Sequence, residues 1–212
     1  MRALIVVDVQ NDFLPGGSLA VPHGDEIVKP VIDLIEDPTE KWDQVVMTRD
    51  WHPHNHISFA KSHNLADFSP ITYVSPVEGD DRKIEGTLFP VHCVEGTRGS
   101  QLAPEMLEEQ KKIGCLIVSK GYLQDREYFS AFNDIWDHHK TELNNYLHCH
   151  GIDEVYVVGL AFEYCVKSTA ISASKLGYKT TILQKYSKGF LSDEKSMQEL
   201  KQELAENNVQ LA

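Results

Sequence analysis

The sequence predicts an α/β protein built on a doubly wound parallel sheet with helices on both faces. Short apolar runs at residues 3–7 and 155–158 are typical of strands buried on both faces of a parallel sheet. Segments with helical spacing of apolar residues lie between such runs. This alternation indicates a parallel sheet, in which functional residues gather at the carboxyl ends of the strands.

The first part of the chain supplies two strands and one helix. Residues 3–7 should form a central strand, and the composition of residues 9–18 indicates a loop. Apolar residues recur with helical spacing at 27–35, although Pro30 lies near the start of that segment. A second strand is expected at 44–48, and it leads into a loop rich in aspartate and histidine.

The middle of the chain is less regular. Residues 60–100 contain one plausible strand at 71–74, and so long a loop region is often functional. A third strong strand is expected at 113–119. A polar helix is expected at 137–150, with Gly151 at its end.

The last part of the chain is organised around a strand and a helix that hold Cys165. Strand 155–158 is followed by a helical pattern that runs from about Glu163 to Gly177. A further strand is expected at 179–183 and a final helix at 193–207.

Composition and charge limit the classes of function. With no linker and no internal repeat, the chain is expected to form one domain over residues 1–212. The net charge of −12 argues against nucleic-acid or anionic-membrane partners and fits a small-molecule substrate. The cysteines lack the spacing of a disulfide framework, and the N-terminal apolar run is too short for a signal peptide. We therefore expect a cytoplasmic location, and the sequence leaves formation of a homo-oligomer open.

Asp8, Lys120 and Cys165 each stand at the end of a predicted strand. An acid, a cation and a thiol at one sheet edge can perform acyl transfer, because the carboxylate can take the thiol proton and return it to a leaving amine. The helix N-terminus and Lys120 are both expected to lower the pKa of Cys165. Taken singly, these residues also have ordinary explanations: a turn cap, a solvated charge and a buried core cysteine.

A second cluster has the composition of a metal site. Asp50 and His52 are two residues apart, which places both side chains on one side of an extended segment. His92 from a distant loop would complete an open site for Zn²⁺ or a similar ion, and His56 is a reserve ligand. The alternative is a histidine-rich surface loop, since the chain has 10 histidines.

Five motifs resemble those of the isochorismatase-like cysteine hydrolases and occur in the order of that family. The matching segments are D-V-Q-N-D-F at 8–13, D-W-H-P followed by His56 at 50–56, P-V-H-C-V with G-T at 90–97, K-G at 120–121, and G-L-A followed by Y-C-V at 159–166. Within the family, the metal motif together with the cysteine is most similar to the nicotinamidases. Residues 125–132 are similar to their fungal branch.

The resemblance implies a six-stranded parallel sheet with helices on both faces, and it implies roles for individual residues. The residues that match the catalytic triad are Asp8, Lys120 and Cys165. The residues that match the ligands of a divalent metal, usually Zn²⁺, are Asp50, His52 and His92.

The resemblance also implies how a substrate would be held. Phe13 and Phe89 match aromatic positions that sandwich a pyridine ring. The backbone N–H groups of Ala161 and Cys165 match an oxyanion hole, and the peptide bond between Leu160 and Ala161 matches one that is cis in the family.

The function implied by the resemblance is hydrolysis of nicotinamide to nicotinate and ammonia through a thioester on Cys165, which would recycle nicotinamide for NAD synthesis. A related amidase acting on a pyrazinamide-like, carbamoyl or ureido substrate would keep the same triad. Isochorismatase itself cleaves a vinyl ether and needs no cysteine. A catalytically inactive binding module is a further alternative, although no triad position is missing.

Overall fold

A six-stranded parallel sheet forms the centre of the molecule, as predicted. The computed structural model describes residues 1–212, and the strand order is β5-β2-β1-β6-β7-β8. The strands of this sheet are β1 (Arg2–Val7), β2 (Gln44–Asp50), β5 (Leu116–Lys120), β6 (Glu154–Leu160), β7 (Lys179–Lys188) and β8 (Val209–Leu211). The chain builds outward from β1 in both directions, so the switch point of the topology lies between β1 and β6. Ligand sites of open α/β sheets lie at such points.

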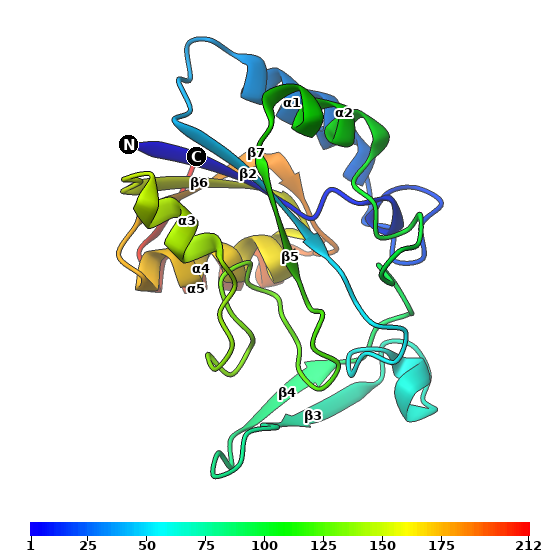
Figure 1. The fold of residues 1–212 in the computed structure, drawn as a ribbon. Coiled ribbons are helices and arrows are strands. Elements are labelled where there is room, and N and C mark those ends of the chain that lie inside the picture. The colour runs from blue at the N-terminus through cyan, green and yellow to red at the C-terminus, as the bar shows by residue number, and fades with distance from the viewer.

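Helices cover both faces of the sheet (Figure 1). The helices on one face are α1 (Val28–Glu36) and α2 (Pro104–Ile113), and those on the other are α3 (Leu143–Cys149), α4 (Lys167–Lys175) and α5 (Glu194–Glu206). Strand β1 serves both layers, because successive side chains point to opposite faces. Leu4 and Val6 pack with the core under α1 and α2, whereas Ala3 and Ile5 pack with the core under α3, α4 and α5. None of the helices combines the length and the apolar character that crossing a membrane requires.

A separate antiparallel hairpin extends from the body of the molecule. It consists of β3 (Pro70–Val74) and β4 (Lys83–Thr87), and it lies beyond the edge of the main sheet (Figure 1). The strand expected at 71–74 therefore exists but pairs outside the central sheet. The sixth strand of the main sheet is the C-terminal β8, for which no sequence pattern was recognised.

The sequence analysis missed one helix and misplaced the starts of two other elements. Residues 104–113 form α2, which the pattern did not predict, and β5 begins at Leu116 because the helix continues through Ile113. The polar helix is confined to Leu143–Cys149. Its predicted first turns are instead a loop, because the Asp134 carboxylate accepts hydrogen bonds from the backbone N–H groups of Trp136 and His138.

Candidate active site

Asp8, Lys120 and Cys165 meet at the carboxyl edge of the sheet, as predicted. The Lys120 ammonium lies 2.9 Å from Asp8 Oδ2 and 3.3 Å from Cys165 Sγ. Asp8 follows β1, Lys120 ends β5, and Cys165 lies in a turn of π-helix (Phe162–Val166) just beyond β6. Three segments that are far apart in sequence thus bring an acid, a cation and a thiol into contact.

The Lys120 side chain is fully buried and forms ion pairs with two carboxylates. Its ammonium also lies 2.5 Å from Oδ1 of Asp50, its register partner across β2 and β5. Burial opposes the charge, but Asp50 and Asp8 raise the pKa of Lys120 well above its usual value. Burial raises the pKa of Asp8 even though Lys120 opposes that rise. Asp8 is therefore a stronger base than an exposed aspartate.

The environment of Cys165 differs from our sequence-based expectation. Burial raises the pKa of its thiol well above the usual value; Lys120 opposes this rise, but Asp8 and Asp50 add to it. The prediction of a lowered pKa was therefore wrong, because it counted the helix end and the lysine but not burial beside two carboxylates. This environment favours the neutral thiol in the free protein and makes a nearby base necessary.

Asp50, His52 and His92 also lie together, and all three are buried. Asp50 Oδ2 is 3.6 Å from His52 Nε2 and 3.9 Å from His92 Nε2. Each imidazole donates its Nδ1–H to a backbone carbonyl, of Gly121 at 2.8 Å and of Pro90 at 2.7 Å. Both Nε2 atoms are therefore left to act as ligands.

The chemistry of this donor set fits a divalent transition metal. One carboxylate and two imidazoles supply ligand atoms that all lie within 4.8 Å of one another. Lys120 contacts both buried carboxylates, Asp8 and Asp50. Burial opposes the charge of His52, but Asp50 raises the pKa of this imidazole, so a metal ion at Asp50 would take the place of the His52 proton. Burial and His52 lower the pKa of His92 to about 4, which keeps this ligand unprotonated at neutral pH.

The backbone around the metal group is held by polar contacts. The Gln10 side chain donates to the carbonyls of Asp50 and Ser100 and accepts the N–H of Asp50, each at 2.8 Å. Gly121 has φ +74°, and a Cβ there would lie 2.4 Å from the His52 ring. A side chain at position 121 would displace His52, which explains glycine directly after Lys120.

His56 is not a member of the donor set. Its ring stacks on His52 with centroids 4.1 Å apart, Nδ1 is 2.7 Å from Ser58 Oγ and Nε2 is 3.0 Å from the carbonyl of Arg126. The Nε2–H must donate to that carbonyl, so Nδ1 accepts from the serine hydroxyl. The reserve role that the sequence allowed for His56 is therefore wrong, because both ring nitrogens already have partners.

Replacing His92 with alanine is expected to weaken the binding of Zn²⁺ by at least about 100-fold, because one of the three candidate ligands is lost. The matched control is the His54→Ala variant, since His54 is exposed and lies in the same loop as His52. Metal content after dialysis against a weak chelator, measured by mass spectrometry, checks this expectation. Wild-type stoichiometry in His92→Ala would contradict the assignment of the ligands.

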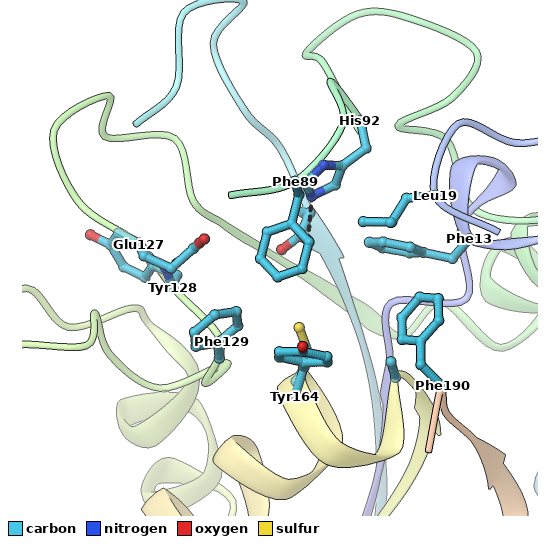
Figure 2. Close-up of a pocket in the computed structure, with 12 residues that line it drawn as sticks. Phe13, Leu19, Phe89, His92, Glu127, Tyr128, Phe129, Tyr164 and Phe190 are labelled. Atoms are coloured by element: carbon cyan, nitrogen blue, oxygen red, sulfur yellow. Dashed lines mark hydrogen bonds and ion pairs between the residues drawn. The ribbon is translucent and has the colours of Figure 1, made fainter. Parts of the chain in front are cut away.

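Cys165, Asp50 and His92 line one pocket, whose empty space is about 380 Å³ including the part open to solvent. Figure 2 shows aromatic rings from several segments of the chain around this pocket, with His92 at its upper side. The lining residues are Phe13, Leu19, Asp50, Phe89, His92, Glu127, Tyr128, Phe129, Ala161, Tyr164, Cys165 and Phe190. An apolar pocket with a few convergent polar groups is suited to a small, flat, mostly uncharged ligand.

The predicted pocket residues Phe13, Phe89 and Ala161 all line this cavity, and the peptide bond between Leu160 and Ala161 is cis. Sequence reasoning missed other members, above all Glu127 and Phe190. Burial raises the pKa of Glu127 to about 7, although His52 opposes the rise. A signal for Glu127 was present, because residues 125–132 were recognised as a matching segment without roles being assigned within it.

Comparison with known proteins agrees with the geometry. The model of the Isochorismatase domain family matches residues 2–207. The chain belongs to the isochorismatase family. Among family members, nicotinamidase of Saccharomyces cerevisiae is 52% identical over 211 residues, which cover 99% of this chain and 98% of that protein.

Among solved structures, the fold of this chain is similar to that of the same yeast protein. The crystal structure of yeast nicotinamidase bound to the inhibitor nicotinaldehyde has a TM-score of 0.98 and 51% identity, and covers 100% of this chain and 99% of that one. A pyrazinamidase of Pyrococcus horikoshii in complex with zinc has a TM-score of 0.74 and 32% identity, and covers 100% and 98%.

Proposed function

We propose that this protein is a nicotinamidase, which hydrolyses nicotinamide to nicotinate and ammonia and so returns nicotinamide to NAD synthesis. The observation that carries the proposal is the identity of 52% with yeast nicotinamidase along nearly the whole of both chains. The contacts among Asp8, Lys120 and Cys165 supply the chemistry that amide hydrolysis requires.

The reaction begins with transfer of the thiol proton from Cys165 to Asp8. The sulfur then attacks the carboxamide carbon, and the C–S bond forms while the carbonyl π electrons move to oxygen. Asp8 gives its proton to the amide nitrogen, the C–N bond breaks and ammonia leaves a thioester on Cys165. Water, losing a proton to Asp8, attacks the thioester, the C–S bond breaks, and the proton passes from Asp8 to sulfur. Nicotinic acid leaves and ionises to nicotinate, with its proton taken up by the released ammonia or by water.

Lys120 stabilises the negative charge as it moves. Its ammonium contacts both Asp8 and Cys165, so the charge can pass from carboxylate to sulfur without losing its counter-ion. A raised pKa of Asp8 narrows the gap in basicity between the carboxylate and the thiolate, which makes proton transfer easier.

The pocket walls provide binding and orientation. We assign the backbone N–H groups of Ala161 and Cys165 to the oxyanion, and the rings of Phe13 and Phe89 to the faces of the pyridine ring. All four residues line the same cavity, which supports this assignment. Exclusion of water by these rings would strengthen the electrostatic interactions within the site.

We assign Asp50, His52 and His92 as ligands of Zn²⁺ or another divalent transition metal. The donor set of one carboxylate and two imidazoles supports the assignment, as does the zinc in the pyrazinamidase of Pyrococcus horikoshii. Such an ion would act as a Lewis acid that orients a substrate with a ring nitrogen. Asp50 joins the two groups, because its other oxygen contacts Lys120.

Release of ammonia from nicotinamide by purified, metal-loaded protein tests the proposed function. We expect turnover that a strong chelator removes and that added Zn²⁺ restores. Turnover that survives complete loss of metal would keep the triad and reject a role for the metal. No turnover by metal-loaded protein would reject nicotinamide as the substrate.

A second candidate function is hydrolysis of a different small amide by the same triad. The zinc-containing relative from Pyrococcus horikoshii is named as a pyrazinamidase, which favours testing pyrazinamide beside nicotinamide. Carbamoyl and ureido compounds complete the panel. The absence of a nucleic-acid partner, a cytoplasmic location and assembly into a homo-oligomer remain predictions from the sequence.

A further inference from the structure

Glu163 holds a distant segment of the chain beside the substrate pocket. Its Oε1 accepts hydrogen bonds from the backbone N–H groups of Phe190 at 2.7 Å and Leu191 at 3.0 Å. Glu163 lies in the π-helical turn that carries Cys165, whereas Phe190 lies just after the end of β7. A single carboxylate thus connects the turn of the nucleophile to a pocket wall that is 27 residues away in sequence.

The contact is close on both sides. A Cβ on Gly189 would lie 2.0 Å from Glu163 Oε2 and 3.1 Å from the Cβ of Phe162. Only glycine at position 189 leaves room for the carboxylate. Glu163 Oε2 is buried without a hydrogen-bond partner, a cost that the two bonds to Oε1 have to offset.

The segment that Glu163 holds provides one wall of the pocket. The Phe190 ring lines the cavity, and Figure 2 shows Phe190 and Phe129 on opposite sides of Tyr164. Its ring packs edge-on against Tyr164, with centroids 6.3 Å apart. Since the backbone N–H of Phe190 is itself bonded to Glu163, the position of the ring depends directly on that carboxylate.

We propose that Glu163 is a positioning residue for substrate selection, which fixes the Phe190 ring as the wall that limits the width of the pocket. This inference rests on the proposed function and deepens it. Phe190 contacts the ring of a bound carboxamide in the ground state and in the transition state alike. Loss of its position should therefore raise KM and leave kcat little changed.

The Glu163→Ala variant tests the proposal. We expect KM for nicotinamide to rise about tenfold, since two charge-assisted hydrogen bonds are lost, while kcat stays within about threefold. Selectivity for nicotinamide over ring-methylated nicotinamides should fall, because the wall can retreat. Glu163→Gln keeps an oxygen acceptor at the same place and should restore KM to within about threefold of the wild type.

Two further variants separate positioning from general destabilisation. Gly189→Ala disrupts the contact between Glu163 and the backbone of Phe190 from the side of the Phe190 segment, so it should also raise KM. Glu26→Ala is the matched control, because the exposed Glu26 side chain pairs with Lys188 of the neighbouring segment at 3.1 Å. An exposed ion pair contributes little to the stability of the segment that it joins, so KM should not change in this control.

A double-mutant cycle with Phe190→Ala decides whether Glu163 acts through the ring. Phe190→Ala alone should raise KM and reduce selectivity, and adding Glu163→Ala should cause no further change. Equal and additive effects of the two substitutions would overturn the proposal, as would an unchanged KM in both Glu163→Ala and Gly189→Ala. If Glu163→Ala does not fold, Gly189→Ala and Phe190→Ala still decide the matter.

These outcomes can be distinguished from failure of the proposed function. If the wild-type protein does not hydrolyse nicotinamide, the same variants are compared on the amide that it does hydrolyse in the panel. The inference fails if Glu163→Ala and Gly189→Ala both keep the wild-type selectivity for that amide over its analogues with a larger ring. It stands if both variants lose selectivity and Glu163→Gln retains it.

Discussion

Replacing Cys165 with alanine is expected to reduce kcat for nicotinamide by at least about 10⁴-fold. Cys165 carries the only thiol among the residues that line the pocket, and its Sγ lies 3.3 Å from the Lys120 ammonium. Any hydrolysis that remains in this variant should be due only to the binding of nicotinamide and the polarisation of its carbonyl group by the rest of the site. Ammonia release under saturating nicotinamide measures the effect.

The Cys149→Ala variant controls for loss of a thiol as such, because Cys149 is exposed at the end of α3 and should be dispensable. Metal content and the unfolding transition of Cys165→Ala should match those of the wild type. A variant that keeps more than a trace of turnover, with its metal and fold intact, would reject the thioester mechanism.

Replacing Lys120 with methionine is expected to reduce the free energy of unfolding by about 3–5 kcal/mol, besides abolishing turnover. Methionine fills much of the same volume but leaves Asp8 and Asp50 buried without the cation that both contact. Removing one partner of a buried ionic group leaves an uncompensated charge. This costs more stability than replacing the whole group by apolar side chains. Urea unfolding of metal-loaded protein at neutral pH measures the loss.

The pH dependence of this loss has a definite sign. Burial raises the pKa of Asp8 even with Lys120 present, and removal of the lysine should raise it further. An acid whose pKa is higher in the folded than in the unfolded state destabilises the fold as pH rises above the unfolded value, about 3.8. The deficit of Lys120→Met relative to the wild type should therefore shrink as pH falls toward 4.

A second substitution checks the cause of this loss. Asp8→Asn in the Lys120→Met background removes one of the two uncompensated charges and should recover part of the lost stability. Equal stability of the single and the double variant at neutral pH would show that packing, and not charge, explains the effect. A deficit that does not change with pH would contradict the electrostatic account as well.

Local pattern was sufficient for much of the fold and for the expectation that Asp8, Lys120 and Cys165 lie at one edge of the sheet. Runs such as the one in β1 are continuous and apolar because both faces of the sheet are covered, so they can be recognised without tertiary information. Asp8 and Lys120 follow or end such runs, and parallel strands bring their carboxyl ends to one edge. The pattern failed for α2, whose exposed face is strongly charged, and for the three-residue strand β8.

By itself, the sequence determined the family and the order of its motifs, and it predicted which residues form the triad and the metal group, because these patterns depend on local spacing along strands and loops. Tertiary structure alone decided what depends on contacts between distant segments. It excluded His56 from the metal group through the carbonyl of Arg126, and it reversed the expected direction of the Cys165 pKa through burial. It also brought Glu163 to the backbone of Phe190, because hydrogen bonds and desolvation act through space, and no spacing in the sequence encodes that contact.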